Sequence, residues 1–313
     1  MTEPFVRPDV RVFLDMMAAN PRPAFTAEFL ASIRGMVMPP EMSADKPVGE
    51  LGEILDLAMP GPGGDIALRL FAPRAERKAG PVVVFYHGGG YAAGSIDSHA
   101  GLAGEIARQL DLPVVSVEYR LAPENPWPAA PDDGEAAARW IAASGATFGR
   151  DITGLILCGD SAGGNLAIVT TLALRDAPAA VPVILQLTFY PAVDHSRDYP
   201  SAEAFAEGYG LDAADMRMFD RHYAADPSDH RNSPLLADQQ GMPPTLVVTA
   251  GLDPLRDEGR AYAAKTALAG VPTVFHEAVG TIHGFAGYRR AIPSAQCDLD
   301  HVLRLAKAML TAR

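Results

Sequence analysis

Gly159-Asp160-Ser161-Ala162-Gly163 is the most informative segment of the chain; it follows the apolar run Leu155-Ile156-Leu157-Cys158 and precedes a helix-like stretch. A serine flanked by glycines at a strand-to-helix turn is typical of a nucleophile elbow, because so tight a turn leaves no room for neighbouring side chains. The turn exposes the Ser161 hydroxyl at the head of a helix, whose N-terminal amides favour negative charge. The pattern therefore predicts a serine nucleophile for acyl transfer.

Strand-like runs alternate with helix-like segments along the rest of the chain. Two runs flanking a Pro/Gly-rich turn predict an opening antiparallel pair, at Ile54–Ala58 and Ile66–Phe71. Six more strands are expected at Val82–Tyr86, Val114–Tyr119, Leu155–Cys158, Val183–Phe189, Thr245–Thr249 and Thr273–His276. Several of these are continuous Val/Ile/Leu runs, as expected for strands buried on both faces. The alternation predicts an α/β fold with a mostly parallel eight-stranded sheet covered by helices on both faces.

The expected helices of this core lie at roughly 98–110, 131–143, 162–175, 256–269 and 297–311. Two other segments do not fit the layered core. Residues 8–38 are typical of two helices separated by Asn20-Pro21-Arg22-Pro23, and the long insertion 191–230 contains a helix near 212–224. Both segments are consistent either with ordinary packing helices or with a cap whose Met and Phe side chains form an adaptable apolar wall.

These two segments define the expected domain organisation. We assign residues 1–50 to an N-terminal helical cap segment and 191–230 to a cap insertion. Residues 51–190 and 231–313 then form the first and second parts of one α/β core. A single domain of this size is ordinary for a 313-residue chain.

Charge and composition disfavour several classes of partner. The 26 basic and 38 acidic side chains leave a net charge of −12, which disfavours nucleic acid and anionic membrane surfaces. The two cysteines, Cys158 and Cys297, are far apart in sequence, so a reducing compartment is expected rather than a disulfide framework. No secretory signal and no apolar run long enough for a membrane span is visible, and a cytoplasmic location is expected.

A serine nucleophile also needs donors for the developing oxyanion. His87-Gly88-Gly89-Gly90 directly follows the strand Val82–Tyr86, and consecutive glycines let backbone N–H groups approach a ligand closely. The alternative is a simple glycine-rich turn. We predict that the N–H groups of Gly88, Gly89 and Ala162 form the oxyanion hole.

The general base is expected among eight histidines, of which His283 alone follows the last strand in a loop at the carboxyl end of the sheet. The others lie in the glycine loop, in a strand, or in helical and insertion segments without special placement: His87, His276, His99, His195, His222, His230 and His301. For the orienting acid, Asp253 is nearest the end of the strand Thr245–Thr249, and Asp257 is its rival. A helix cap is the structural alternative for Asp253.

Together these motifs resemble the hormone-sensitive-lipase-like esterases, also called bacterial family IV, of the α/β-hydrolases. The resemblance spans about residues 65–310 and rests on His87–Gly90, Gly159–Asn165, Asp253–Asp257, His283–Phe285 and Tyr119–Glu124. It implies a helical cap, no cofactor or metal, and often a homodimer. It also implies a serine carboxylesterase acting on short- to medium-chain acyl esters, with Ser161 as nucleophile, His283 as base and Asp253 as orienting acid.

Other activities remain open for this constellation. A related hydrolase acting on amides, lactones or acyl-peptides would use the same triad, and a non-catalytic ligand-binding protein could share the scaffold. The aromatic residues that we expect around a small-molecule ester are Tyr91, Tyr190, Phe205, Tyr209, Phe219 and Phe285, although part of this set could belong to the core.

Overall fold

The computed structural model describes residues 3–34, 42–76 and 78–311. These residues form a sheet of eight strands in the order β1-β2-β4-β3-β5-β6-β7-β8, in which only β2 runs antiparallel to its neighbours. The strands are β1 Glu53–Gly61, β2 Gly64–Ala72, β3 Gly80–Tyr86, β4 Val114–Val117, β5 Ile152–Asp160, β6 Val183–Phe189, β7 Thr245–Leu252 and β8 Thr273–Ile282. The predicted fold class is confirmed, and all eight strands lie where the sequence placed them.

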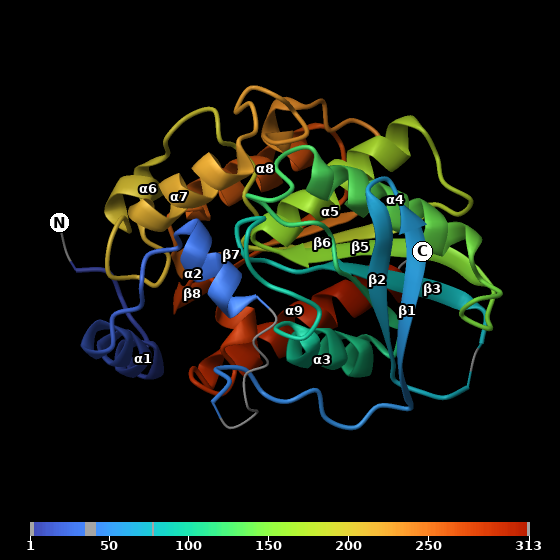
Figure 1. Ribbon diagram of the computed structural model, residues 1–313, viewed down its shortest axis with the longest axis horizontal. Coiled ribbons are helices and arrows are strands. Elements are labelled where there is room, and N and C mark those ends of the chain that lie inside the picture. Colours follow the sequence, from blue (N-terminus) through green and yellow to red (C-terminus); the bar gives the residue numbers. More distant parts are fainter. Residues whose placement is uncertain (1–2, 35–41, 77, 312–313) are drawn as a thin grey trace.

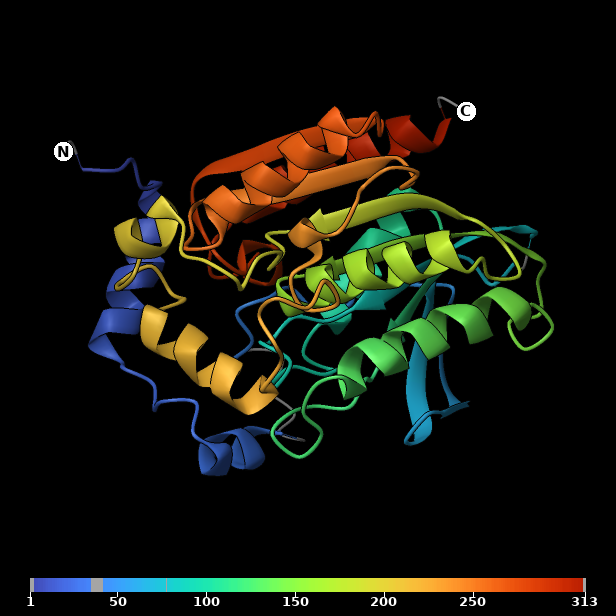
Figure 2. The same cartoon turned by 90° about the horizontal axis from the view of Figure 1, so that it is seen from above.

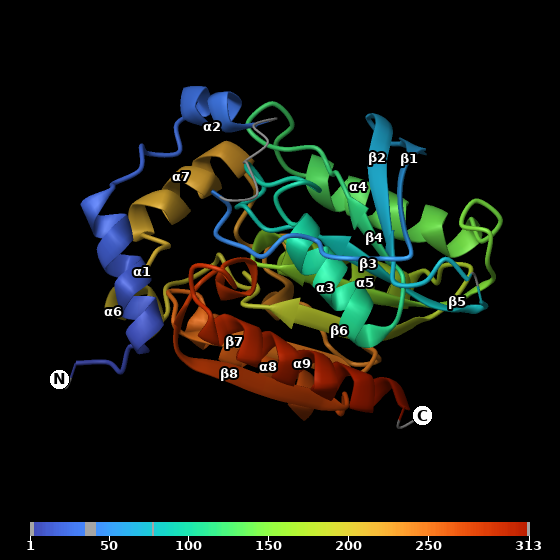
Figure 3. The same cartoon turned by 90° about the horizontal axis from the view of Figure 1, so that it is seen from below.

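Helices cover both faces of this sheet (Figures 1 and 2). One face is covered by α4 Ala129–Ala143, α5 Ala162–Asp176 and α8 Arg256–Leu268. The other is covered by α3 Ala100–Leu110 and α9 Ser294–Thr311, which lie in front of the strands in Figure 3. Successive strand residues point to opposite faces, so β3 supplies Val83 and Phe85 to the core beneath α3 and α9, and Val82 and Val84 to the core beneath α4 and α5.

Four further helices gather at one end of the sheet, as Figure 1 shows: α1 Pro8–Ala19, α2 Ala27–Ile33, α6 Pro200–Ala204 and α7 Ala213–Tyr223. The N-terminal segment packs on the insertion through an Arg22–Asp215 ion pair and a contact between the Phe25 and Phe219 rings, whose centroids are 4.9 Å apart. The predicted end of the second helix, at residue 38, lies outside the described residues. The domain boundaries stay predictions.

The carboxyl ends of the parallel strands meet at the edge of the sheet that faces these four helices (Figure 1). Ser161 follows β5, Asp253 follows β7 and His283 follows β8. Parallel strands place the loops after their carboxyl ends side by side, which is how three distant segments reach one site. Within the described part of the chain, no helix is both long and apolar enough to cross a bilayer.

Candidate active site

Ser161 lies between the last residue of β5 and the first residue of α5, in a strained backbone conformation with φ 55° and ψ −122°. A non-glycine residue in such a region costs about 1–3 kcal/mol, which the surrounding packing must offset. A Cβ atom on Gly159 would lie 2.2 Å from the Gly163 carbonyl oxygen, and one on Gly163 would lie 2.0 Å from the Tyr86 carbonyl oxygen. Glycine is therefore required on both sides of the serine, as the elbow motif predicts.

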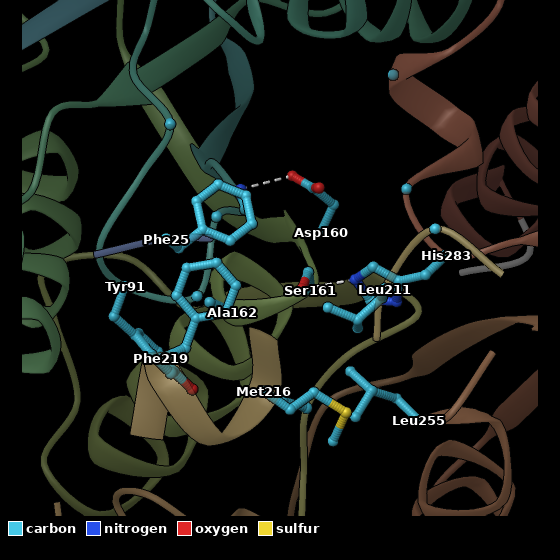
Figure 4. Close-up of a pocket in the computed structure, with 18 of the residues that line it drawn as sticks. Phe25, Tyr91, Asp160, Ser161, Ala162, Leu211, Met216, Phe219, Leu255 and His283 are labelled. Atoms are coloured by element: carbon cyan, nitrogen blue, oxygen red, sulfur yellow. Dashed lines mark hydrogen bonds between the residues drawn. The ribbon is translucent and has the colours of Figure 1, made fainter. Parts of the chain in front are cut away.

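A hydrogen-bonded relay joins the three side chains predicted to form the triad, and Figure 4 shows the bond of this relay between Ser161 and His283. His283 Nε2 is 2.8 Å from Ser161 Oγ, and His283 Nδ1 is 2.8 Å from Asp253 Oδ2. The carboxylate can only accept, so the imidazole proton is assigned to Nδ1, which leaves Nε2 free to accept the serine proton. The Asp253 side chain is fully buried, and its Oδ1 accepts a hydrogen bond from the Leu255 N–H at 2.8 Å. The bond from Leu255 thus fixes the Asp253 carboxylate, which is the buried end of the relay.

The rival carboxylate points elsewhere. Asp257 pairs with Arg256 and Arg260 and accepts a hydrogen bond from the Ser201 N–H at 3.0 Å. None of its contacts in the described residues is with His283. Asp257 therefore fastens α6 to the start of α8, and it has no place in the relay.

One predicted oxyanion donor is already engaged. The Gly88 N–H donates to Asp160 Oδ1 at 2.8 Å, the second bond drawn in Figure 4. This contradicts the expectation that Gly88 faces the substrate, because a backbone N–H that is bonded to a buried carboxylate is not free to bind an oxyanion. The N–H groups of Gly89, Gly90 and Ala162 have no hydrogen-bond acceptor among the described residues. The three glycines of the loop are indistinguishable in sequence, so the engagement of the Gly88 N–H could not be predicted.

Asp160 and His99 form a second polar pair directly behind the glycine loop. His99 Nε2 is 3.4 Å from Asp160 Oδ1, and both side chains are mostly buried. Burial disfavours the charged form of each group, yet their mutual attraction raises the pKa of His99 and lowers that of Asp160. The expectation that His99 has no special placement is therefore wrong. Nothing in the sequence marks its proximity to the loop, which depends on how α3 packs.

His87, the histidine of the glycine loop, has a structural role. Burial, reinforced by the nearby His99, lowers the pKa of His87 to about 3, so its ring is neutral. Its Nδ1–H donates to the Gly88 carbonyl at 2.8 Å, and the ring stacks on Tyr119 with centroids 4.3 Å apart. The Tyr119 hydroxyl donates to the His87 carbonyl at 2.7 Å. These contacts fix the path of the loop together with the bond from Gly88 to Asp160.

Ser161 and His283 open onto a cavity of about 550 Å³ between the sheet edge and the helices α1, α6 and α7. Two of the six predicted pocket aromatics, Tyr91 and Phe219, lie on its wall. Met17 and Met216 also line it, as the cap alternative for the two helical segments expects, whereas Phe25, Leu211 and Leu255 were missed by sequence reasoning. Figure 4 shows Phe25, Phe219 and Tyr91 on one side of the serine, and Leu211, Met216 and Leu255 on another.

The other four predicted pocket aromatics are not among the described residues that line this cavity. Tyr190 and Phe285 are buried behind the catalytic edge, where the Tyr190 ring packs against those of His283 and Phe285 at centroid distances of 4.8 and 5.3 Å. Phe205 belongs to the core and packs edge-on against Tyr209. The prediction was wrong for these four residues because an aromatic residue in the core cannot be told from one in a pocket by sequence alone. Tyr190 instead supports the position of the His283 ring.

Several charged residues also border the cavity, among them Asp194, His195 and Glu258. Burial raises the pKa of Glu258 to about 8, partly opposed by the nearby His195, and its Oε1 accepts a hydrogen bond from the Val193 N–H at 2.7 Å. The Asp194 carboxylate is satisfied by Ser196 and Tyr199. No group of three or more potential metal ligands is found within residues 3–34, 42–76 and 78–311.

An eight-stranded sheet with a serine elbow after β5, and with an aspartate and a histidine after β7 and β8, is the architecture of the α/β-hydrolases. A family model described as "alpha/beta hydrolase fold" matches residues 83–287. The chain belongs to this family, in its hormone-sensitive-lipase-like branch, bacterial family IV.

Similar proteins are named as esterases. Esterase LipI of Mycobacterium tuberculosis is 38% identical over 257 residues, which is 80% of each chain. Carboxylesterase NlhH of the same organism is 36% identical over 308 residues, 94% of this chain and 95% of that one. The solved structure of ester-hydrolase EH1AB1 from the metagenome of Lake Arreo, complexed with a derivative of bipyridine phosphonate, has a TM-score of 0.90 and 39% identity, and the match covers 97% of this chain and 99% of that one.

Proposed function

We propose that this protein is a serine carboxylesterase that hydrolyses short- to medium-chain acyl esters through an acyl-enzyme intermediate. The observation that carries the proposal is the continuous hydrogen-bonded relay Ser161–His283–Asp253 at the floor of an apolar cavity. Nucleophile, base and orienting acid are then linked at hydrogen-bonding distance, which is the arrangement that activates a serine hydroxyl. The esterase names of its relatives support the same reaction class.

In the proposed reaction, Ser161 Oγ attacks the ester carbonyl carbon while His283 Nε2 takes its proton. Asp253 stabilises the imidazolium that forms and keeps the ring in the productive tautomer. His283 then gives the proton to the departing alcohol, which leaves an acyl group on Ser161. A water molecule attacks this acyl-enzyme with His283 again as base, which releases the acid and restores the serine.

We assign the oxyanion hole to the N–H groups of Gly89, Gly90 and Ala162. Their lack of partners in the described residues supports this assignment, as does the position of Ala162 at the first turn of α5, where backbone amides have no acceptor within the helix. Gly88 acts indirectly in this scheme, because its bond to Asp160 holds the loop that carries two of the donors.

The size and lining of the cavity favour small esters. A volume of about 550 Å³ must hold both the acyl and the alcohol portion, and apolar side chains such as Phe25, Met216 and Phe219 form part of its wall. Hydrolysis of amides, lactones or acyl-peptides is the second candidate, because the relay does not discriminate between leaving groups. A purely ligand-binding role is disfavoured by the presence of His283 at hydrogen-bonding distance from Ser161.

An acyl-chain series of p-nitrophenyl esters tests the proposal. We expect the highest kcat/KM at roughly two to eight acyl carbons, the range that the resemblance to the hormone-sensitive-lipase-like esterases implies; a cavity of about 550 Å³ is of ordinary size for a small-molecule site. Ser161→Ala should abolish turnover at every chain length, whereas Ser228→Ala, at a serine that caps an exposed turn, should match the native protein. Equal rates across the series, or full activity in Ser161→Ala, would refute it. Paired ester and anilide substrates separate the two candidate activities.

A further inference from the structure

The helix α7 contacts the glycine loop at two points. At the first, Phe219 lies so close to Gly90 that a Cβ atom on the glycine would be 2.3 Å from the Phe219 ring. At the second, the ring of Tyr223, the last residue of α7, stacks on the ring of Tyr91, the residue after Gly90. The two ring centroids are 3.7 Å apart and the interplanar angle is 5°. The helix α7 thus packs on the loop that carries two of the assigned oxyanion donors.

The backbone of Tyr91 is in a conformation that needs such support. Its φ of 58° lies in the left-handed region, which a residue with a side chain rarely adopts, and such a conformation persists only where the surrounding structure holds it. The Tyr91 carbonyl accepts a hydrogen bond from the Ala122 N–H at 2.9 Å, and the Tyr223 carbonyl accepts one from the Trp127 N–H at 2.9 Å. The segment 122–127 therefore ties the end of α7 to the end of the glycine loop.

The contact between the two rings is what fixes the Tyr223 side chain. Both residues are almost fully buried, with 3% of Tyr91 and 2% of Tyr223 exposed, and a buried aromatic pair is more stable than its buried area alone accounts for. The Tyr223 hydroxyl is buried and has no hydrogen-bond partner among the described residues, so the ring makes the contact and the hydroxyl adds nothing to it. Tyr223 is not among the described residues that line the cavity, and its route to the reacting atoms is through Tyr91.

We propose that Tyr223 is a positioning residue for the oxyanion hole: its stack on Tyr91 holds Gly89 and Gly90 so that their N–H groups point at the oxygen of the tetrahedral intermediate. This inference rests on the proposed function and on the donors assigned there. Well-placed donors act where charge develops, so loss of the stack lowers kcat and leaves the binding of the ester largely unchanged. A helix that lines the cavity through Met216 and Phe219 then also sets the geometry of the catalytic loop.

Four single variants test this role. Tyr223→Leu removes the ring, Tyr223→Phe keeps the ring and removes only the hydroxyl, and Tyr91→Leu removes the same contact from the side of the loop. Phe148→Leu is the matched control, because Phe148 is a buried ring of the same core cluster as Tyr223 and Tyr91. It lies in the connection that enters β5, at the end of this strand opposite to Ser161.

Kinetics with p-nitrophenyl butyrate and inhibition by butyl trifluoromethyl ketone separate positioning from a general loss of structure. Ser161 Oγ adds to the carbonyl carbon of the ketone, the serine proton passes to His283, and the ketone oxygen becomes an oxyanion that the same N–H donors hold. The Ki of the ketone therefore depends on these donors, whereas KM reports mainly the binding of the uncharged ester. The value of kcat is expressed per active site, titrated with a p-nitrophenyl alkylphosphonate, so that unfolded protein does not contribute.

We expect Tyr223→Leu to lower kcat by about 10-fold to 10²-fold with KM within about threefold, because the donors are displaced; complete loss of one donor costs about 10²–10³-fold. The Ki of the ketone should rise by about the same factor. Tyr223→Phe should recover kcat to within about threefold of the native value, since it keeps the ring. Tyr91→Leu should repeat the loss, and the double variant Tyr91→Leu/Tyr223→Leu should be at most about threefold slower than the slower single variant, because both changes remove one contact.

The inference is overturned if Tyr223→Leu keeps kcat within about threefold of the native value, if Phe148→Leu loses as much, or if the Ki of the ketone does not rise as kcat falls. Tyr91→Leu applies the same criteria from the side of the loop if Tyr223→Leu does not fold. The proposed function is judged separately in the same assay. If the native protein hydrolyses the ester and Ser161→Ala does not, the esterase assignment stands whatever Tyr223 does.

Discussion

Replacement of Asp160 tests whether its buried carboxylate holds the glycine loop His87–Gly90, to which we assign two of the oxyanion donors. This side chain accepts the Gly88 N–H at 2.8 Å, lies 3.4 Å from His99 Nε2 and is 5% exposed. Asp160→Ala removes the acceptor and leaves a buried N–H unpaired, which costs about 1–3 kcal/mol. The loop can recover part of this cost by shifting, and a shift would displace the donors on Gly89 and Gly90.

The expected kinetic effect follows from that displacement. Loss of one oxyanion donor lowers turnover by about 10²–10³-fold in serine hydrolases. We therefore expect Asp160→Ala to lower kcat by between about 10-fold and 10³-fold, with KM within about threefold, because these donors act mainly on the transition state. Asp160→Asn keeps an acceptor for Gly88 and should lose about tenfold or less. Asp226→Ala, at an exposed turn, is the matched control and should be unaffected.

The interaction between Asp160 and His99 should also make the thermal stability of the protein depend on pH. The pKa of Asp160 is lowered from 3.8, so its contribution is present above that value and is lost at lower pH. The pKa of His99 is raised from 6.5, so its contribution is present below that value and is lost as the pH rises. The unfolding temperatures of the native protein and Asp160→Asn should thus differ more at pH 5.5 than at pH 9. A kcat unchanged in Asp160→Ala would refute the role assigned to this carboxylate.

Three further predictions concern the relay, a buried acid and the glycine loop. Asp253→Asn should lower kcat by about 10³-fold or more, whereas Asp257→Asn should stay within about threefold. Burial raises the pKa of Glu258 to about 8, so the stability it contributes below pH 4.5 is lost as the pH rises through 8, and Glu258→Gln should flatten this decline in thermal unfolding temperature. Gly90→Ala should lower kcat/KM at least tenfold, since φ is +59° and the new Cβ would lie 2.3 Å from the Phe219 ring.

Each of these has a contrary outcome. Equal losses of kcat in Asp253→Asn and Asp257→Asn would contradict the assignment of Asp253 alone to the relay. A Glu258→Gln protein with the native pH profile would mean that this carboxyl is ionised in the fold. An active Gly90→Ala protein would mean that the loop and Phe219 separate easily, and activity regained in the double variant Gly90→Ala/Phe219→Ala would confirm their contact.

Much of the fold was predictable because strand burial leaves a direct mark on sequence. The parallel strands β3, β5 and β7 are apolar on both faces, and such runs separated by helical segments allow few alternatives. The positions of Ser161, Asp253 and His283 followed from topology, since each comes directly after a strand in a parallel sheet.

The parts that sequence could not supply depend on side-chain direction. Whether Tyr190 points into the cavity or behind His283 is decided by packing, and both outcomes have the same local sequence. The Gly88 N–H is bonded by Asp160, a contact between the glycine loop after β3 and the last residue of β5, which no local sequence pattern predicts. His99 and Phe25 reach the site through helix packing and through the N-terminal segment, which no local pattern reports.

The most direct test of the whole account is covalent labelling with a p-nitrophenyl alkylphosphonate, followed by peptide mapping. A serine esterase of this design should take up one label per chain, on Ser161, with stoichiometric loss of esterase activity. His283→Gln should be labelled at least about 10²-fold more slowly, because the base that takes the serine proton is gone. A label on any other residue, or hydrolysis that continues after Ser161 is fully modified, would contradict the central claim.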